Sequence, residues 1–195
     1  MKVTLASSNK GKLAEFQQLL SGLNFEVVPQ SEFQVPDAIE NGLSFVENAI
    51  IKARHASKLT GLPAIADDSG LEVDFLNGAP SIYSSRFSGE NATDEKNNQR
   101  LLSLLQEAEE NERTARFQCL LVYMRHPEDP TPIICQGTWE GLITLSPEGE
   151  NGFGYDPLFY IPEFGCTSAQ LEKTQKNKVS HRGKAMAQLL EKLSR

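Results

Sequence analysis

Residues 2–20 read KVTLASSNKGKLAEFQQLL, and the order of residue types in this stretch indicates the class of fold. A short run rich in β-forming residues extends from Lys2 to Ala6, and a polar turn occupies residues 7–12. Apolar residues then recur at helical spacing, at Leu13, Phe16, Leu19 and Leu20. A strand, a loop and a helix in this order predict an α/β protein.

The clearest helix begins at Ser44, where Ser44 and Glu47 form a capping box, and it is expected to end near Gly61 and Pro63. The other predicted elements are a strand at 25–28, a helix capped by Thr93 and Asp94, two pairing strands at 115–124 and 133–143, a short helix near 170–173 and a last helix after Ser180. We therefore expect a single α/β domain over residues 1–195, with a long mixed β-sheet and flanking helices.

The composition limits the classes of function. A chain of 195 residues with 39% apolar content can bury one substantial core. A net charge of -7 argues against binding to nucleic acid, which requires a broad basic surface. The three cysteines lack the spacing of a zinc site or a disulfide framework. Because no segment has the apolar run of a membrane helix or a secretory signal, we expect a cytoplasmic protein with no membrane partner.

Two aspartates stand between short apolar runs. The polar stretch Asp67-Asp68-Ser69-Gly70 follows a brief strand predicted at 63–66 and precedes another at 71–73. Carboxylates at a strand end suit Mg²⁺, which prefers oxygen ligands. Because adjacent side chains of a strand point to opposite faces, the two aspartates are expected to differ in role. The alternative interpretation is an acidic turn closed by Ser-Gly. Glu40 could supply a second carboxylate, and Lys52 could neutralise phosphate charge.

The polar turn between the first strand and the first helix contains hydroxyl, amide and ammonium groups. Its residues are Ser7, Ser8, Asn9, Lys10, Gly11 and Lys12. Such groups at a helix N-terminus can hold an anion, which the helix dipole favours. The pattern lacks the spacing of a Walker A loop, and a solvated turn is the alternative interpretation. By itself the turn leaves both possibilities open.

Two further segments could bind a base. The stretch 152–157 sets Phe153 and Tyr155 among glycines, so that a ring could stack on a base while Asp156 accepts hydrogen bonds from ring nitrogens. An aromatic loop without a ligand is the alternative. The second segment brings hydrogen-bond donors to the start of the last helix, at Lys176, Ser180, His181 and Arg182. Ordinary surface charge is the alternative there.

Taken in this order, five stretches resemble the inosine triphosphate pyrophosphatase family, also called the non-canonical purine nucleoside triphosphate pyrophosphatases, over essentially the whole chain. The stretches are SSNKGK at 7–12, ENAIIKAR at 47–54, ADDSGL at 66–71, GFGYDP at 152–157 and SHRG at 180–183. No departure from the family's pattern disables the site. The resemblance implies a homodimer with two lobes around a central cleft.

The resemblance also implies residue roles. Asp68 would be the proton acceptor that activates water and would contact Mg²⁺, with Glu40 assisting the ion. The triphosphate would be held by the turn Ser7, Ser8, Asn9, Lys10, Gly11 and Lys12, together with Lys52 and Ser69. The base would be held by Phe153, Gly154, Tyr155, Asp156, Lys176, His181 and Arg182.

The activity implied is the hydrolysis of ITP, dITP and XTP to the nucleoside monophosphate and pyrophosphate, with Mg²⁺ as cofactor. Donors from His181 and Arg182 would suit the 6-oxo group of hypoxanthine or xanthine and would disfavour the 6-amino group of adenine. No residue accounts for the rejection of guanine. Two alternatives stay open at this point: a nucleotide-binding module without turnover, and a phosphatase that releases orthophosphate.

Overall fold

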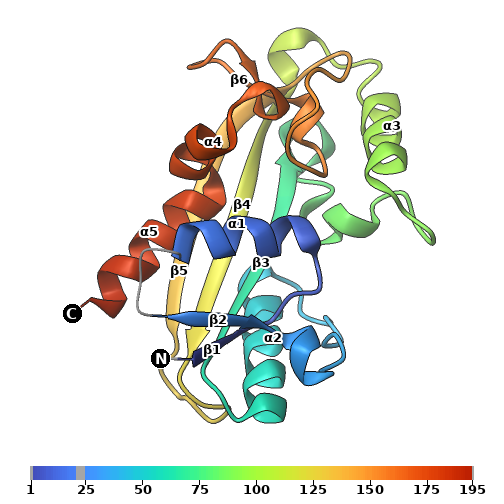
Figure 1. Ribbon diagram of the computed structural model, residues 1–195. Helices are drawn as coiled ribbons and strands as arrows, with labels where there is room; N and C mark the ends of the chain where they lie inside the picture. Colours follow the sequence, from blue (N-terminus) through green and yellow to red (C-terminus); the bar gives the residue numbers. More distant parts are fainter. Residues whose placement is uncertain (1, 21–24, 195) are drawn as a thin grey trace. The chain divides into compact units, whose positions relative to one another are not determined.

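The protein is described from a computed structural model, which describes residues 2–20 and 25–194 (Figure 1). Within these residues, no helix is both long and apolar enough to cross a membrane. The helices are α1 (Lys10–Leu20), α2 (Phe45–Thr60), α3 (Asp94–Leu104), α4 (Lys173–Val179) and α5 (His181–Leu193). Short 3₁₀ segments lie at Gln30–Phe33, Asp74–Leu76, Ser81–Arg86, Glu110–Glu112, Asp156–Leu158 and Ser168–Gln170.

The strands of the described residues form one seven-stranded sheet in the order β2-β1-β3-β4-β5-β6-β7. They are β1 (Lys2–Leu5), β2 (Glu26–Pro29), β3 (Ala64–Val73), β4 (Thr114–Met124), β5 (Ile133–Ile143), β6 (Phe159–Ile161) and β7 (Cys166–Thr167). The strand β1 pairs in parallel with β2 and β3, whereas β6 pairs antiparallel with β5 and β7. The predicted mixed sheet with flanking helices is confirmed. The sequence analysis did not find β6 and β7, which have three and two residues.

The serine cap predicted for α2 is confirmed, and the Glu47 side chain reaches back to Leu43 and to the Ser44 hydroxyl. The Ser44 hydroxyl accepts a hydrogen bond from the Glu47 backbone N–H at 3.4 Å and donates one to the Glu47 carboxylate at 2.7 Å. The same carboxylate accepts the Leu43 N–H at 2.9 Å. The Gly61 N–H makes the last helical bond, to the Ser57 carbonyl at 2.9 Å, and the left-handed φ of 68° at Gly61 then turns the chain out of the helix. Local chemistry therefore sets both ends of this helix.

Two element predictions were wrong. The two strands expected at 63–66 and 71–73 are one continuous strand, β3, and the acidic stretch lies inside it instead of in a turn. Buried cations on neighbouring helices satisfy the acidic side chains, so the strand does not need to break there. The short helix expected near 170–173 begins at Lys173. Gln170 instead closes a separate turn, because its side-chain oxygen accepts the Thr167 N–H at 2.8 Å, and the next residue, Leu171, is extended.

The chain divides into two compact units. Unit 1 consists of Met1–Asp68, Cys119–Gly137 and Arg182–Arg195, and unit 2 consists of Ser69–Gln118 and Thr138–His181. The predictions of a single domain over residues 1–195 and of two lobes around a cleft stay predictions.

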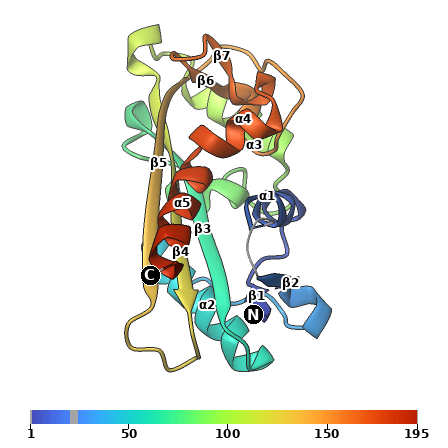
Figure 2. The same ribbon diagram turned by 60° about the vertical axis from the view of Figure 1, so that its left-hand side comes forward.

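In unit 1, α1 and α5 pack apolar side chains into a common core. The core includes Val3, Leu5, Phe16, Leu20, Ile65, Leu121, Ala185, Met186 and Leu189. The helix α5 runs beside β5 (Figure 2), where the Gln188 side chain donates to the Gln136 carbonyl at 2.7 Å and Lys192 donates to the Ile134 carbonyl at 2.8 Å. The apolar face predicted for the last helix is confirmed.

In unit 2, the core gathers aromatic rings from three strands. Phe117 lies 4.5 Å from Phe159 between ring centroids, and Trp139 lies 5.3 Å from the same ring. Leu101 of α3 and Leu105, which caps the helix, are fully buried in this core. The close packing of these large side chains holds α3 against the core of unit 2.

Candidate functional site

The carboxyl end of β1 brings the predicted anion-binding turn close to the two aspartates. Leu5 of β1 pairs with Ile65 of β3, and the Ala6 N–H donates to the Ile65 carbonyl at 2.8 Å. The strand β1 ends there, whereas β3 continues through Asp67 and Asp68. The acid pair thus extends beyond the end of a parallel neighbour, the position where α/β sheets commonly bind ligands.

The two aspartates face different helices, as the alternation of side chains along a strand predicts. The Asp67 carboxylate contacts Lys12 of α1 and Arg182 of α5. The Asp68 carboxylate contacts Lys52 of α2. Both side chains are buried, so each depends on its own cation for charge balance.

Asp67 lies at the centre of a buried ion cluster in unit 1. Its Oδ1 is 2.5 Å from Lys12 Nζ, and its Oδ2 is 3.1 Å from both Nε and Nη2 of Arg182. Arg182 also forms an ion pair with Glu15, and Cys119 Sγ lies 3.6 Å from Asp67 Oδ2. These ion pairs join two cations to two carboxylates. Asp67 is therefore held by protein cations on both of its oxygens.

Electrostatics keeps this cluster ionised. Burial favours the neutral form of the Asp67 carboxyl, but the charges of Lys12 and Arg182 hold its pKa well below the ordinary value. Burial likewise acts to lower the pKa of Arg182, and the carboxylates of Asp67 and Glu15 raise it. Because two protein cations already balance its charge, Asp67 is poorly suited to bind a further cation.

Asp68 has a different charge environment. Its Oδ1 lies 2.7 Å from Lys52 Nζ, which is also 3.4 Å from Glu40 Oε2. One cation is thus shared between two carboxylates. The other oxygen, Asp68 Oδ2, is buried and has no hydrogen-bond partner within residues 2–20 and 25–194. Burial raises the pKa of the Asp68 carboxyl against the attraction of Lys52, and Glu40 raises it further.

These residues fit a magnesium ion. The excess negative charge and the unpartnered buried oxygen of Asp68 suit a hard cation. Within the part of the chain that the structure describes, no group of three or more His, Cys, Asp or Glu residues could hold a metal by itself. Mg²⁺ commonly keeps waters and binds substrate phosphate oxygens in addition to one or two carboxylates, so two acids are sufficient.

The predicted anion-binding turn leads directly into α1, which begins at Lys10. The Asn9 side chain caps the helix by accepting the Lys12 N–H at 3.0 Å, and the Ser7 hydroxyl accepts the Asn9 N–H at 3.2 Å. The Ser8 hydroxyl donates to Asp37 at 2.8 Å. Because the first turn of α1, which includes Gly11, contains no acidic residue, the positive end of the helix dipole is open to an anion.

In unit 2, Asp156 organises the predicted base-binding loop. Its Oδ2 accepts the Phe153 backbone N–H at 2.8 Å and the Lys176 ammonium at 2.6 Å, and its Oδ1 accepts the Ser168 hydroxyl at 2.8 Å. Lys176 Nζ also lies 5.2 Å from the centroid of the Phe153 ring. The structure therefore brings together three of the residues that the sequence indicated: Phe153, Asp156 and Lys176.

The other predicted base-binding residues lie in the interior. Tyr155 belongs to the core of unit 2, and its hydroxyl donates to the Ser84 carbonyl at 2.8 Å. His181 is buried and stacks on Phe117, with ring centroids 4.8 Å apart. Arg182 belongs to unit 1, where its guanidinium is committed to Glu15 and Asp67. Ser69 follows Asp68 directly in β3 and is half-buried.

Sequence reasoning missed Glu15, which is 6% exposed and pairs with Arg182. A carboxylate on the side of α1 that carries Phe16 and Leu20 into the core could have signalled a buried partner, but not which cation it meets. The sequence indicated that Asp67 and Asp68 differ in role, but it assigned no role to Asp67. Its neutralisation by Lys12 and Arg182 now separates it from Asp68.

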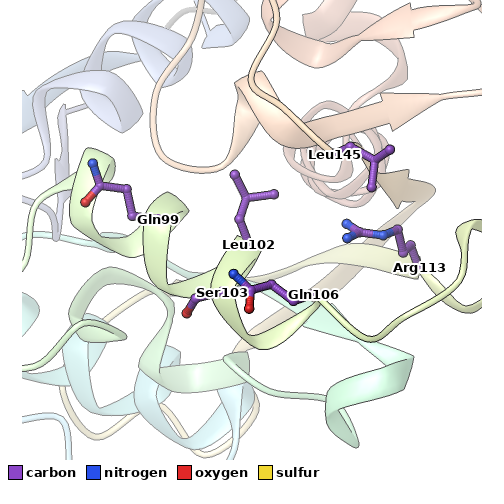
Figure 3. A pocket seen from close by; sticks show the side chains of 6 residues that line it. All are labelled: Gln99, Leu102, Ser103, Gln106, Arg113 and Leu145. Atoms are coloured by element: carbon purple, nitrogen blue, oxygen red, sulfur yellow. The ribbon is translucent and has the colours of Figure 1, made fainter.

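A pocket of about 440 Å³ lies beside α3 in unit 2 (Figure 3). Its lining residues are Gln99, Leu102, Ser103, Gln106, Arg113 and Leu145. The Arg113 guanidinium donates to the Leu105 carbonyl at 2.7 Å and to the Thr144 carbonyl at 3.2 Å. The first bond satisfies the carbonyl of the C-cap residue of α3, and the second holds the residue that follows β5, so Arg113 has a structural role.

Comparison with known proteins places this arrangement in a family. The chain is 58% identical over 188 residues to a protein of Vibrio cholerae named dITP/XTP pyrophosphatase, covering 96% of this chain and 94% of that protein. It is 56% identical to a protein of the same name from Escherichia coli O157:H7, covering 98% of each. The solved structure of a HAM1 protein from Coxiella burnetii superposes with a TM-score of 0.92 at 52% identity, covering 100% of this chain and 98% of that one.

The family match extends over nearly the whole length of the sequence. Residues 3–192 match the Ham1 family, a span that includes every residue predicted for the site. The resemblance recognised from the sequence motifs is confirmed. The chain belongs to the Ham1 family.

Proposed function

We propose that this protein hydrolyses non-canonical purine nucleoside triphosphates, namely ITP, dITP and XTP, to the nucleoside monophosphate and pyrophosphate. The observation that carries the proposal is the environment of Asp68: a buried carboxylate with one oxygen on Lys52, the other unpartnered among the described residues, and Glu40 beside the same lysine. The names of the relatives from Vibrio cholerae and Escherichia coli, dITP/XTP pyrophosphatase, support it.

We infer that Glu40 and Asp68 hold Mg²⁺. When bound, the ion would offset the charge of the triphosphate and polarise its oxygens. Lys52 and Lys12 would donate to phosphate oxygens from two helices of unit 1. The N-terminal turn of α1 would add backbone N–H donors. Ser69 is assigned to the same phosphates by the resemblance.

In the proposed reaction, Asp68 accepts a proton from a water molecule as the water oxygen attacks the α-phosphorus. The bond between the α-phosphorus and the bridging oxygen breaks, and pyrophosphate leaves with the bonding electron pair. The Asp68 Oδ2 atom, which has no hydrogen-bond partner among the described residues, is available to accept this proton. Asp67, held by Lys12 and Arg182, keeps its charge and takes no proton in this scheme.

The loop in unit 2 is proposed to bind the base. Stacking of a purine on Phe153 would contribute roughly 1–3 kcal/mol without discriminating strongly between bases. The resemblance assigns discrimination to His181 and Arg182 as donors to the 6-oxo group. Because the Arg182 guanidinium is held by Glu15 and Asp67, we assign this donor role to His181. Asp156 has its oxygens on Phe153, Lys176 and Ser168, so we assign it the placement of Lys176 and of the loop backbone.

Two other functions were possible from the sequence: a binding module without turnover and a phosphatase that releases orthophosphate. The relatives named above do not support either. We further propose a homodimer located in the cytoplasm, as the family resemblance implies. Sedimentation equilibrium of the purified chain tests the dimer directly, and a monomer at micromolar concentration would contradict it.

A rate panel tests the proposed function. We expect turnover of ITP, dITP and XTP with release of pyrophosphate, at least tenfold slower turnover of GTP and ATP, and loss of turnover when Mg²⁺ is chelated. Asp68→Asn should lower kcat at least about 100-fold while the Kd for ITP changes only a few-fold. Glu72→Gln, on the same strand, is the matched control and should retain activity. Release of orthophosphate, or near-normal turnover by Asp68→Asn, contradicts the proposal.

A further inference from the structure

The helix α3 is hydrogen-bonded to the base-binding loop at one residue, Gly154. The Asp94 carboxylate accepts the Gly154 backbone N–H at 2.7 Å, and the Asn98 side-chain NH₂ donates to the Gly154 carbonyl at 3.0 Å. The two side chains are four positions apart, so they project from the same face of the helix. Both polar groups of one glycine are therefore held by a single turn of α3.

Gly154 is the residue at which this loop changes direction. Its φ of 63° is left-handed, and no other atom would lie within 4 Å of a Cβ at this position. The glycine is thus required by the backbone conformation and not by lack of space. On one side stands Phe153, whose N–H is bonded to Asp156, and on the other Tyr155, whose hydroxyl is bonded to Ser84. The two hydrogen bonds to Gly154 therefore fix the backbone next to the Phe153 ring.

The helix α3 is itself held in place by side-chain hydrogen bonds and by packing. The Asn97 side chain accepts the Ser88 N–H at 2.7 Å and donates to the Ser84 and Ser85 carbonyls at 3.3 and 3.2 Å. The fully buried Leu101 holds the same helix on the core. The Thr93 side chain caps its first turn by accepting the Lys96 N–H at 3.2 Å. A loop bound to such a helix is pre-organised instead of being ordered by the ligand.

We propose that Asp94 and Asn98 are positioning residues for purine recognition. By fixing Gly154, they hold the Phe153 ring and the loop backbone in the geometry that receives the base. The inference rests on the proposed function, because it takes the loop at 152–156 as the base site. Neither residue touches the base or the phosphates in this scheme; each acts through Gly154.

The chemistry of the two bonds sets the choice of variants. Asp94 accepts a hydrogen bond, so Asp94→Asn keeps an acceptor oxygen and should behave as the parent protein does. Asp94→Ala removes the acceptor, and Asn98→Ala removes the donor. Gln99→Ala is the matched control: it lies on the same helix, is exposed, and its side-chain amide bonds Glu95.

The experiment measures KM and kcat for ITP, and the inhibition constant of inorganic triphosphate, for the parent and each variant. We expect KM to rise about fivefold in Asp94→Ala and in Asn98→Ala, and at least about tenfold in the double variant. The value of kcat should stay within about twofold, and the inhibition constant of triphosphate should not change, because the probe has no base. Asp94→Asn and Gln99→Ala should match the parent protein.

Two results would overturn the inference. The first is a KM for ITP within twofold of the parent value in the double variant. The second is a parallel loss of triphosphate inhibition and kcat, which indicates general disruption instead of a misplaced loop. Melting curves of all variants show whether each one is folded. Absence of ITP hydrolysis by the parent protein is a separate result, which overturns the proposed function and this inference with it.

Discussion

The guanidinium of Arg182 lies 3.1 Å from the carboxylate of Asp67, although 115 positions separate the two residues in the chain. The same guanidinium pairs with Glu15 of α1. The first residues of the last helix are therefore linked by ion pairs to β3 and to the first helix. The cluster explains how Asp67 stays ionised in a buried position, and it makes the protein sensitive to the loss of any one member.

Removal of the arginine should leave two buried carboxylates without sufficient positive charge. We expect Arg182→Met to lower the free energy of unfolding by about 3–5 kcal/mol, as measured by urea denaturation. The double variant Glu15→Gln with Arg182→Met should lose less than the arginine variant alone, because one of the orphaned charges is gone. If the double variant loses the sum of the two single effects, Glu15 and Arg182 are not coupled.

The neighbouring aspartates should respond differently to the same substitution. Asp67→Asn leaves Lys12 and Arg182 with Glu15, an excess of one buried positive charge, so the free energy of unfolding should fall by about 3 kcal/mol or more. Asp68→Asn leaves Lys52 paired with Glu40 and removes a carboxylate whose charged form burial disfavours, so it should lower the free energy of unfolding less than Asp67→Asn does. Urea denaturation of both variants in one buffer checks the contrast. Equal losses would show that the assignment of cations to the two acids is wrong.

Gly152 should be essential to the placement of Asp156. A Cβ at this position would lie 2.0 Å from Asp156 Oδ2, and the glycine has a φ of 79°. Gly152→Ala should displace the carboxylate from Lys176 and raise KM for ITP about tenfold or more. Gly165→Ala serves as control, since that φ of 64° is similar but nothing lies within 4 Å of its Cβ. It should cost about 1–2 kcal/mol of stability and leave KM unchanged.

A surface ion pair in unit 2 should make stability depend on acidic pH. Hydrogen bonds from Arg116 and Thr114 lower the pKa of Asp74 from 3.8 to about 2. Because the folded pKa lies below the unfolded one, this stabilisation is fully present above about pH 4 and is lost as the pH falls toward 2. The Asp74 side chain is 46% exposed, so solvent screening limits the effect to about 1 kcal/mol or less.

Asp74→Asn tests this dependence. The free energies of unfolding of the parent and the variant should differ at pH 7, and the difference should shrink as the pH falls from 4 through about 2. Salt at 1 M should reduce the difference at pH 7, because the pair is close to solvent. A difference that persists unchanged at pH 2 would exclude the ion pair as its cause.

Most of the fold could be predicted from local patterns. Ser44, Glu47 and Gly61 fixed the ends of α2, and the helical spacing of Ala185, Met186 and Leu189 identified the buried face of α5. The continuity of β3 could not be predicted in the same way. A local pattern treats Asp67-Asp68-Ser69-Gly70 as a turn, because the cations that make an acidic strand acceptable come from other helices.

The candidate site shows the same limit. The sequence indicated Glu40, Lys52 and Asp68 as a group, and the structure places them within ion-pair distance. It also indicated Lys12 and Arg182 as ligands of a substrate, but only three-dimensional contacts show that both are bound to Asp67. The roles of Asp94 and Asn98 were not predictable, because nothing in α3 itself indicates that it meets Gly154.

Because Asp67 and Asp68 alternate along β3, the register of this strand determines which cation each aspartate faces. A shift of β3 by one residue against β1 would turn Asp67 toward Lys52 and Asp68 toward Arg182, with the composition of the chain unchanged. A change of length in the loop that precedes Ala64 would leave this alternation unchanged. One residue inserted or deleted between Ile65 and Asp67 would exchange the faces of the two aspartates, so the length of this segment should matter more than the identity of its other residues.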